Sequence, residues 1–371
     1  MWPKAEISFT IRLVTPAFLG RADQKSEWRV PPFKHLLREW WRCLATVRDN
    51  VRAQDLLSKE RRLFGGVHGD AAQRSQVEIM FEPTQACEIA WQKGTLSNPF
   101  PGGASVFHPE ARRGMNIDAL LYLGYGPLEY DSATRSSKLK SPPALAAGAQ
   151  VRARIRCPAS CKGDIETVLG LVHWLGTVGG RCRNGWGSLD ILRSDESPWC
   201  PRDVAGLIDI QKDWSQCLDL EWSHALGTAP SDGGTSLLLW RTKEAFGDWK
   251  EAMNSLARLK IELRTGSTCG SPIPISGNPD KRHLLGYPVG ERHKVRGWER
   301  LASQLRFKVI KERLDGDACP KYYGIAYHMP HGLPAEMTEA YQARITPFRN
   351  FEKTVWQDVH SRLDTLMKRW N

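Results

Sequence analysis

The sequence predicts an α+β protein of two domains. Its 371 residues are enough for two domains of ordinary size, each with a core of its own. Apolar and polar residues alternate strictly over 7–14, as in a half-buried strand. Apolar residues then recur at helical spacing over about 33–48. This mixture of periods continues along the chain and is typical of antiparallel sheets packed against helices.

Strands and helices are both predicted in the first half of the chain, as this fold class requires. After the strand at 7–14, helical patterns cover 33–48 and 53–64, and the second ends at Gly65-Gly66, a suitable C-cap. Asp164 is the expected N-cap of a later helix that runs to about Leu175. Residues 132–143 carry Arg135, Lys138 and Lys140, and we expect either a mobile hairpin over nucleic acid or a plain solvated loop. The remaining predicted strands of this half are 76–82, 117–123, 149–157 and 186–192.

The second half follows a boundary region at about 193–234, rich in turn residues. We therefore predict domains at 1–195 and 196–371. Strands are expected at 236–240, 305–310 and 323–327, with helices at 243–258 and 351–370.

A glycine-rich stretch between a predicted helix and a predicted strand is the strongest motif in the chain. Residues 179–188 read GGRCRNGWGS, and we call them the glycine loop. Glycines let the main chain approach a ligand closely, and Arg181 and Arg183 offer planar guanidinium groups to phosphate. The alternative is a helix C-cap followed by an ordinary turn. We predict phosphate contact by both arginines and by Gly179, Gly180, Gly185 and Gly187.

The order of elements excludes a mononucleotide loop. Such loops follow a strand, precede a helix and end in Gly-Lys-Ser/Thr, whereas this loop follows a helix and lacks that ending. The formal net charge of +11 favours a polyanionic partner. No apolar run approaches the roughly 18 residues that a membrane span needs, so we expect no membrane partner. A strand begins almost at the first residue, so we expect no signal peptide and a cytoplasmic location.

The first predicted helix carries a row of cations four residues apart. Lys34, Arg38 and Arg42 form either a solvated face or an RNA contact. Trp41 borders this row and either belongs to the core or stacks on a base. Glu60 falls on the apolar stripe of the next helix and must be paired there. We expect an arginine of the first helix or of the glycine loop as its partner, in a structural role.

Nine scattered cysteines do not form a disulfide framework. Cys157 and Cys161 suggest a zinc site, with Cys182, Cys200 or His173 as further ligands. A structural zinc site usually shows two close ligand pairs, and here there is one. We therefore predict no metal and no cofactor.

The order and spacing of several short motifs resemble the RAMP superfamily, and within it the first-subunit family of the Cmr module, the type III-B CRISPR effector complex. The glycine loop resembles the glycine-rich loop that defines this superfamily. The other matching segments are TPAFLG at 15–20, Arg29, FK at 33–34, LREWWR at 37–42, Glu60, LFGG at 63–66, LLGYP at 284–288, RLAS at 300–303 and FKV at 307–309.

The resemblance implies two ferredoxin-like (RRM-like) domains in a non-catalytic RNA-binding subunit. Its partners would be guide RNA, target RNA and sibling subunits, with no small-molecule substrate. Arg21 would be a further RNA contact. We expect tryptophans such as Trp199 and Trp222 to be buried only against partner subunits.

Two alternatives remain open. One is a metal-free guide-processing endoribonuclease with His35 as its base. The other is a scaffold that contacts only protein. None of the ten histidines precedes an aspartate, so the His-Asp motif of metal nucleases is absent.

Overall fold

The computed structural model describes residues 3–20, 23, 25–68, 71–82, 88–91, 94–96, 103–111, 114–134, 136–140, 143–231, 234–265, 279–287, 295–312 and 319–370. The chain forms two compact units. The first comprises Met1–Pro101, Gly124–Gln211 and Lys308–Ile310, and the second comprises Gly102–Leu123, Lys212–Phe307 and Lys311–Asn371. The units are not consecutive stretches of chain, and the predicted division after residue 195 stays a prediction.

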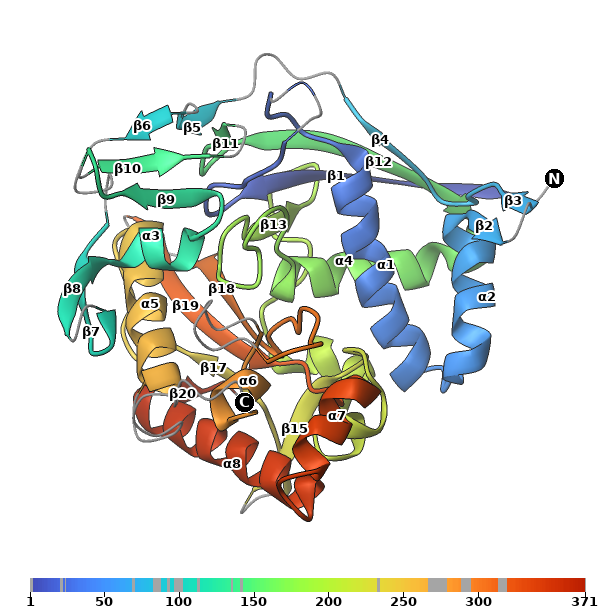
Figure 1. The fold of residues 1–371 in the computed structure, drawn as a ribbon. Helices are drawn as coiled ribbons and strands as arrows, with labels where there is room; N and C mark the ends of the chain where they lie inside the picture. The colour runs from blue at the N-terminus through green and yellow to red at the C-terminus, as the bar shows by residue number, and fades with distance from the viewer. Residues whose placement is uncertain are drawn as a thin grey trace. The chain divides into compact units, whose positions relative to one another are not determined.

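The first unit is built on a four-stranded sheet in the order β13-β1-β12-β4. All three neighbouring pairs are antiparallel. Counted along the chain, one helix lies between the first and second strands of this sheet and another lies between the third and fourth. The unit therefore has the βαββαβ order of a ferredoxin-like domain (Figure 1). Its elements are β1 (Lys4–Leu13), α1 (Val30–Val47), β4 (Glu78–Phe81), β12 (Gln150–Pro158), α4 (Lys162–Leu175) and β13 (Leu189–Leu192).

Every second residue of β1 contributes to the core of this unit. Ile7, Phe9, Ile11 and Leu13 are buried, because α1 and α4 cover that face of the sheet (Figure 1). α2 (Ala53–Phe64) packs against α1. β2 (Gly66–His68) and β3 (Ala71–Gln73) form a hairpin after α2.

The segment at 132–143 is part of a second sheet, so the expectation of a plain solvated loop was wrong. β10 (Ser136–Leu139) pairs with β9 (Leu128–Asp131) and with β6 (Gly94–Leu96). Lys138 and Lys140 pair with Asp131 and Glu129. These ion pairs and the strand pairing hold the hairpin. Arg135 lies outside the described residues. β5 (Ile89–Trp91) and β11 (Ala144–Leu145) form a further pair.

The second four-stranded sheet repeats the same topology. Its order is β18-β19-β17-β20, which is again the ferredoxin-like order when the strands are counted along the chain. The prediction of two ferredoxin-like domains is therefore confirmed at the level of topology. The elements are β17 (Leu239–Arg241), α5 (Trp249–Thr265), β18 (Leu305–Glu312), β19 (Lys321–His328), α8 (Phe348–Leu366) and β20 (Lys368–Arg369).

Smaller elements complete the second unit. Among them are a hairpin of β7 (Ser105–His108) and β8 (Met115–Asp118), and a sheet of β14 (Gln211–Asp213), β15 (Leu226–Ser231) and β16 (Gly234–Leu237). Among the described residues, the short helices are α3 (Ala119–Gly124), α6 (Lys281–Leu284) and α7 (Ala335–Gln342), with 3-10 turns at Ala159–Cys161, Val204–Ile210 and Gln216–Asp219.

Two local predictions were wrong. Only the start of 117–123 is a strand, because Asp118 Oδ1 accepts a hydrogen bond from Leu121 N (2.8 Å) and so starts helix α3. Asp164 is not the N-cap of α4, since Cys161 occupies that position. The carboxylate of Asp164 lies in the first turn of α4 and pairs with Arg48 at 2.7 Å.

No helix in the described part of the chain is long and apolar enough to cross a membrane.

Candidate nucleic-acid interface

The glycine loop connects α4 to β13 in a conformation that requires its glycines. Gly179, Gly185 and Gly187 have φ values of +90°, +92° and +65°. A β-carbon at Gly187 would lie 1.8 Å from Val178 O, and one at Gly179 would lie 2.8 Å from Phe18 O. Side chains are excluded at both positions, by backbone contact as well as by φ.

The loop is fastened to the segment that follows β1. Thr15 Oγ1 donates to Gly185 O (2.7 Å) and accepts from Ser188 N (2.9 Å). Gly180 N donates to Phe18 O (3.0 Å), and Gly187 N donates to Pro16 O (2.8 Å). These bonds explain why the TPAFLG segment and the glycine loop occur together in one sequence. They also engage the N–H groups of Gly180 and Gly187 within the protein.

Arg181 is held in an unusual conformation within this loop. Its φ of +58° is left-handed, which costs a non-glycine residue roughly 1–3 kcal/mol. Asn184 N donates to Arg181 O (2.8 Å) and closes the turn. The guanidinium lies over Gly126, where a β-carbon would be 2.7 Å from Nη2. Arg181 and Arg183 are both partly exposed.

A buried acid anchors the strand that follows the loop. Asp190, on β13, accepts from Arg12 (2.9 Å) and Arg202 (2.7 Å). Burial would raise the pKa of Asp190, but the charges of Arg202 and Arg12 outweigh it and lower the pKa. Burial itself lowers the pKa of His173 well below its usual value. His173 Nδ1 accepts from Ile191 N (3.1 Å), which fixes that ring beside the strand.

Lys308 is fully buried within the same unit. Its Nζ donates to the carbonyl oxygens of Val172 (3.3 Å), His173 (2.7 Å) and Leu189 (2.7 Å). The amine thus caps the carboxyl end of α4, where a helix favours a cation. Burial lowers the pKa of Lys308 far below that of an exposed lysine. We did not predict these contacts from the sequence. Asp190 and Lys308 are each a single charged residue within an apolar strand, and that pattern was the signal that could have indicated a buried partner.

Glu60 organises the cationic row on α1. It is 1% exposed, and its carboxylate accepts from Arg38 Nε (2.5 Å), Arg42 Nε (2.5 Å) and Arg42 Nη2 (2.9 Å). Burial would raise the pKa of Glu60, yet the bonds and charges of Arg42 and Arg38 lower it. The prediction that an arginine of α1 pairs with Glu60 is confirmed.

The row keeps an excess of positive charge. Lys34 Nζ donates to Ser75 Oγ (2.8 Å), and burial followed by the charge of Arg38 lowers its pKa. The three cations lie beside two carboxylates, Glu60 and Glu39, since the charge of Glu39 also raises the pKa of Arg42, and the group keeps a net charge of +1. The side chains of Arg38 and Arg42 remain 30% and 29% exposed. Part of each guanidinium therefore faces solvent while Glu60 orients it.

The remaining candidates are dispersed. Arg21 lies outside the described residues, and His35 is exposed on α1. Trp41 is buried against Phe64, with ring centroids 5.8 Å apart, and belongs to the core. The described residues contain no group of three or more His, Cys, Asp or Glu that could hold a metal ion.

One tryptophan expectation was wrong. Trp199 is buried within the first unit, where its Nε1 donates to Glu166 O (3.0 Å). The guanidinium of Arg193 lies 4.9 Å from the centre of its ring. This residue is therefore covered by its own chain. Trp222 is partly exposed.

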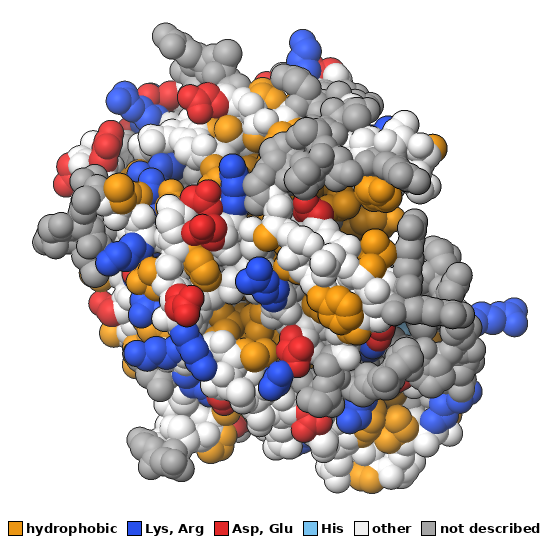
Figure 2. Space-filling model, turned by 90° about the vertical axis from the view of Figure 1, so that its left-hand side faces the viewer, with side chains coloured by type: hydrophobic (Ala, Val, Ile, Leu, Met, Phe, Trp, Pro, Cys, Tyr) orange, Lys and Arg blue, Asp and Glu red, His pale blue; other side chains and the backbone are white. Residues whose placement is uncertain are grey.

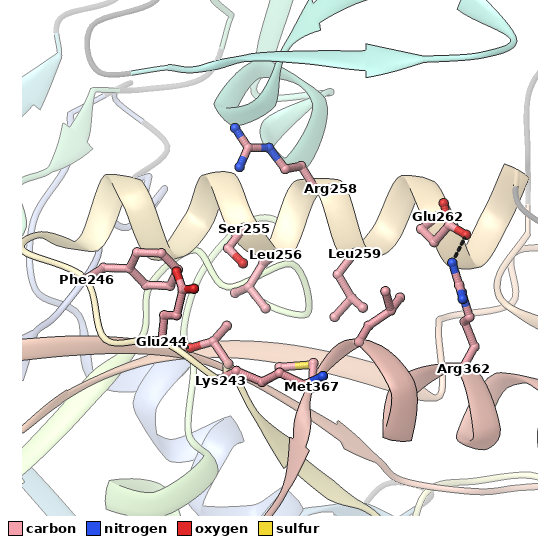
Figure 3. A pocket seen from close by; sticks show the side chains of 12 residues that line it. Lys243, Glu244, Phe246, Ser255, Leu256, Arg258, Leu259, Glu262, Arg362 and Met367 are labelled. Carbon is pink, nitrogen blue, oxygen red and sulfur yellow. Dashed lines mark hydrogen bonds and ion pairs between the residues drawn. The ribbon is translucent and has the colours of Figure 1, made fainter.

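A pocket of about 410 Å³ in the second unit is separate from these residues. Leu256 and Leu259 of α5 point into it, as does Met367, while Arg258 points away (Figure 3). At one end Glu262 pairs with Arg362 at 2.5 Å (Figure 3). This pairing neutralises two of the charges that line the pocket.

Charge on the surface is mixed. On the face drawn in Figure 2, Lys and Arg side chains lie scattered among acidic and hydrophobic ones.

Comparison with solved structures finds a similarity that covers nearly the whole chain. No family model and no curated protein matches the chain. Among solved structures, the chain is similar to the crystal structure of Cmr1 from Pyrococcus furiosus in its apo form, with 18% identity and a TM-score of 0.42. The similarity covers 95% of this chain and 96% of that one.

Proposed function

We propose that this chain is a non-catalytic, RNA-binding subunit of a type III-B CRISPR effector complex, and that it contacts guide RNA, target RNA or both along their backbone. The observation that carries the proposal is Arg181. It is a non-glycine residue in a left-handed conformation, on a loop whose two sides are hydrogen-bonded to the segment after β1. Strained residues of this kind persist where their surroundings over-determine them, and they cluster at ligand sites.

The chemistry of the loop suits phosphate. Arg181 and Arg183 present guanidinium groups, which bind phosphate oxygens in pairs. The glycines contribute shape, because the N–H groups of Gly180 and Gly187 already donate within the protein. Gly179 and Gly185 supply the positive φ values that let the arginines project from a tight turn.

The row on α1 is the second part of the proposed interface. Arg38 and Arg42 keep exposed surface and a fixed orientation through Glu60. Lys34 extends the row by one turn, and Arg21 remains a proposed contact from outside the described residues. Phosphate contacts of this kind position RNA but carry no sequence information.

Base pairing would then supply sequence, as in other guided systems, while the protein recognises backbone shape and charge. The sequence motifs shared with the Cmr first-subunit family support sibling subunits of such a complex as protein partners. Two ferredoxin-like units in one chain agree with that family's expected architecture. The fold alone does not imply this function, and so the arginines carry the test.

The test compares two double variants of equal charge change. Arg181→Ala/Arg183→Ala removes the loop cations, whereas Arg52→Ala/Arg74→Ala removes two surface arginines that are 72% and 90% exposed. We expect each loop arginine to contribute about 1–3 kcal/mol to RNA binding. The loop variant should also flatten the dependence of log K on log salt by about one unit or more, and the control should change both far less.

Folding must be checked alongside, by circular dichroism and thermal unfolding. If the loop variant folds and binds RNA with unchanged affinity and salt slope, phosphate binding by the loop is refuted. Equal losses in both variants would show that net charge alone matters. A protein that binds sibling subunits but no RNA would support the scaffold alternative.

A further inference from the structure

Two exposed tyrosines lie in the first unit, on the turn and the strand that follow α3. Tyr125 is 62% exposed and Tyr130 is 44% exposed. Tyr125 stands in the turn between α3 and β9, and Tyr130 stands on β9 itself. Rings at this exposure are open to a stacking partner such as a nucleic-acid base.

The turn that carries Tyr125 packs directly on the loop. A β-carbon at Gly126 would lie 2.7 Å from Arg181 Nη2, and one at Gly180 would lie 3.4 Å from Pro127 Cγ. The φ of Gly126 is +122°, which favours glycine, and the guanidinium of Arg181 leaves no room there for a side chain. The guanidinium of Arg181 is therefore a close neighbour of Tyr125 along the surface.

The hairpin holds a further cation at this turn. Lys140 N donates to Pro127 O (2.8 Å), which ties the end of β10 to the turn. Lys140 Nζ pairs with Glu129 at 2.5 Å. On the same hairpin, Tyr130 lies opposite Ser137, a buried residue of β10. Two exposed aromatic rings and Lys140 thus belong to one turn and the hairpin tied to it, and Arg181 packs against that turn.

We propose that Tyr125 and Tyr130 stack on unpaired bases of a single-stranded RNA segment whose backbone lies at Arg181. The inference rests on the proposed function and deepens it by naming the state of the RNA. Single strands can splay their bases onto aromatic rings, whereas a duplex keeps its bases paired inside. A cation beside aromatic rings is the combination that binds single strands without sequence preference.

The experiment measures binding of the full-length protein to a single-stranded RNA and to a duplex RNA of the same length. Tyr125→Ala/Tyr130→Ala should weaken binding to the single strand by about 30-fold or more, that is by about 5-fold or more for each ring, and leave binding to the duplex unchanged. The salt slope should stay as in the unaltered protein, because no phosphate contact is lost. Tyr125→Phe/Tyr130→Phe keeps both rings and should bind as the unaltered protein does.

Phe107→Ala is the matched control, because Phe107 is also 62% exposed and lies in the second unit. It should change neither affinity. Unchanged single-strand affinity in the folded tyrosine variant, with a loss in the Arg181→Ala/Arg183→Ala variant, overturns the stacking inference and leaves the proposed function standing. Equal weakening of single-strand and duplex binding by the tyrosine variant also overturns it. If the arginine variant changes nothing while the tyrosine variant weakens single-strand binding, stacking stands and the phosphate site is refuted.

Discussion

A buried chain of histidines in the second unit should make the stability of the protein depend on pH. His328 Nε2 lies 3.2 Å from Gln304 Oε1, and His360 Nε2 lies 3.0 Å from His328 Nδ1. Gln304 Nε2 donates to His331 O (2.8 Å), so its oxygen faces His328 and accepts. Each of the two rings therefore donates through Nε2, and the pair is neutral.

Burial sets the pKa of both rings. It lowers the pKa of His328 well below the usual value, and a proton on His360 or His331 would repel one on His328. It lowers the pKa of His360 to about 3, helped by Arg369. In the unfolded chain a histidine titrates at about 6.5. Between these values the unfolded state binds more protons than the folded state, so the stability falls as the pH falls through 6.5.

The magnitude follows from that window. At pH 5 the unfolded state is about 1.5 pH units below its histidine pKa, so His360 alone lowers the free energy of unfolding by about 2 kcal/mol relative to pH 7.5. The replacement His360→Gln keeps a donor at the position of Nε2 and removes the titrating group. We expect the difference in unfolding free energy between pH 7.5 and pH 5 to shrink by about 2 kcal/mol in this variant.

Urea denaturation at both pH values measures this difference for the unaltered protein and for His360→Gln. At pH 7.5 the variant should unfold close to the unaltered protein, since the hydrogen bond to His328 remains. A variant that keeps the full pH dependence would refute the assignment of His360 as a buried neutral group.

Three further predictions concern the first unit. Lys308→Met keeps the shape of the side chain but removes the donor to the carbonyl oxygens of His173 and Leu189 and one of the two donors to Val172 O, so the free energy of unfolding should fall by about 3 kcal/mol in urea denaturation; a change below about 0.5 kcal/mol would contradict the capping role. Glu60→Gln removes the charge that pairs with Arg38 and Arg42, and we expect a loss of about 1–3 kcal/mol of stability, discounted for the partial exposure of both arginines. The same urea series measures it, and unchanged stability would show that the two arginines need no partner. Incubation of the purified protein with guide precursor or target RNA, with or without divalent cations, should yield no specific cleavage; cleavage that disappears in His35→Ala would instead establish the processing-enzyme alternative.

Much of the fold could be predicted from the sequence because the relevant signals are local. Alternation places Ile7, Phe9, Ile11 and Leu13 on one face of β1 whatever lies elsewhere in the chain. Helical spacing did the same for α1, and the acid at Glu60 stood out because it interrupts an apolar stripe. The glycine loop was recognisable because positive φ restricts the choice of residue. The boundaries failed where capping decided them, as at Asp118.

Only the tertiary structure decided which distant groups meet. Thr15 reaches Gly185 across 170 positions, and Lys308 reaches the end of α4 across 135. Tyr125 comes beside Arg181 through the packing of one turn on another. Such contacts depend on how strands pair and how helices cover them, and no local pattern records that geometry. A charge within an apolar strand announces that a partner must exist, because burial without one is costly, but the identity of the partner is set by the fold.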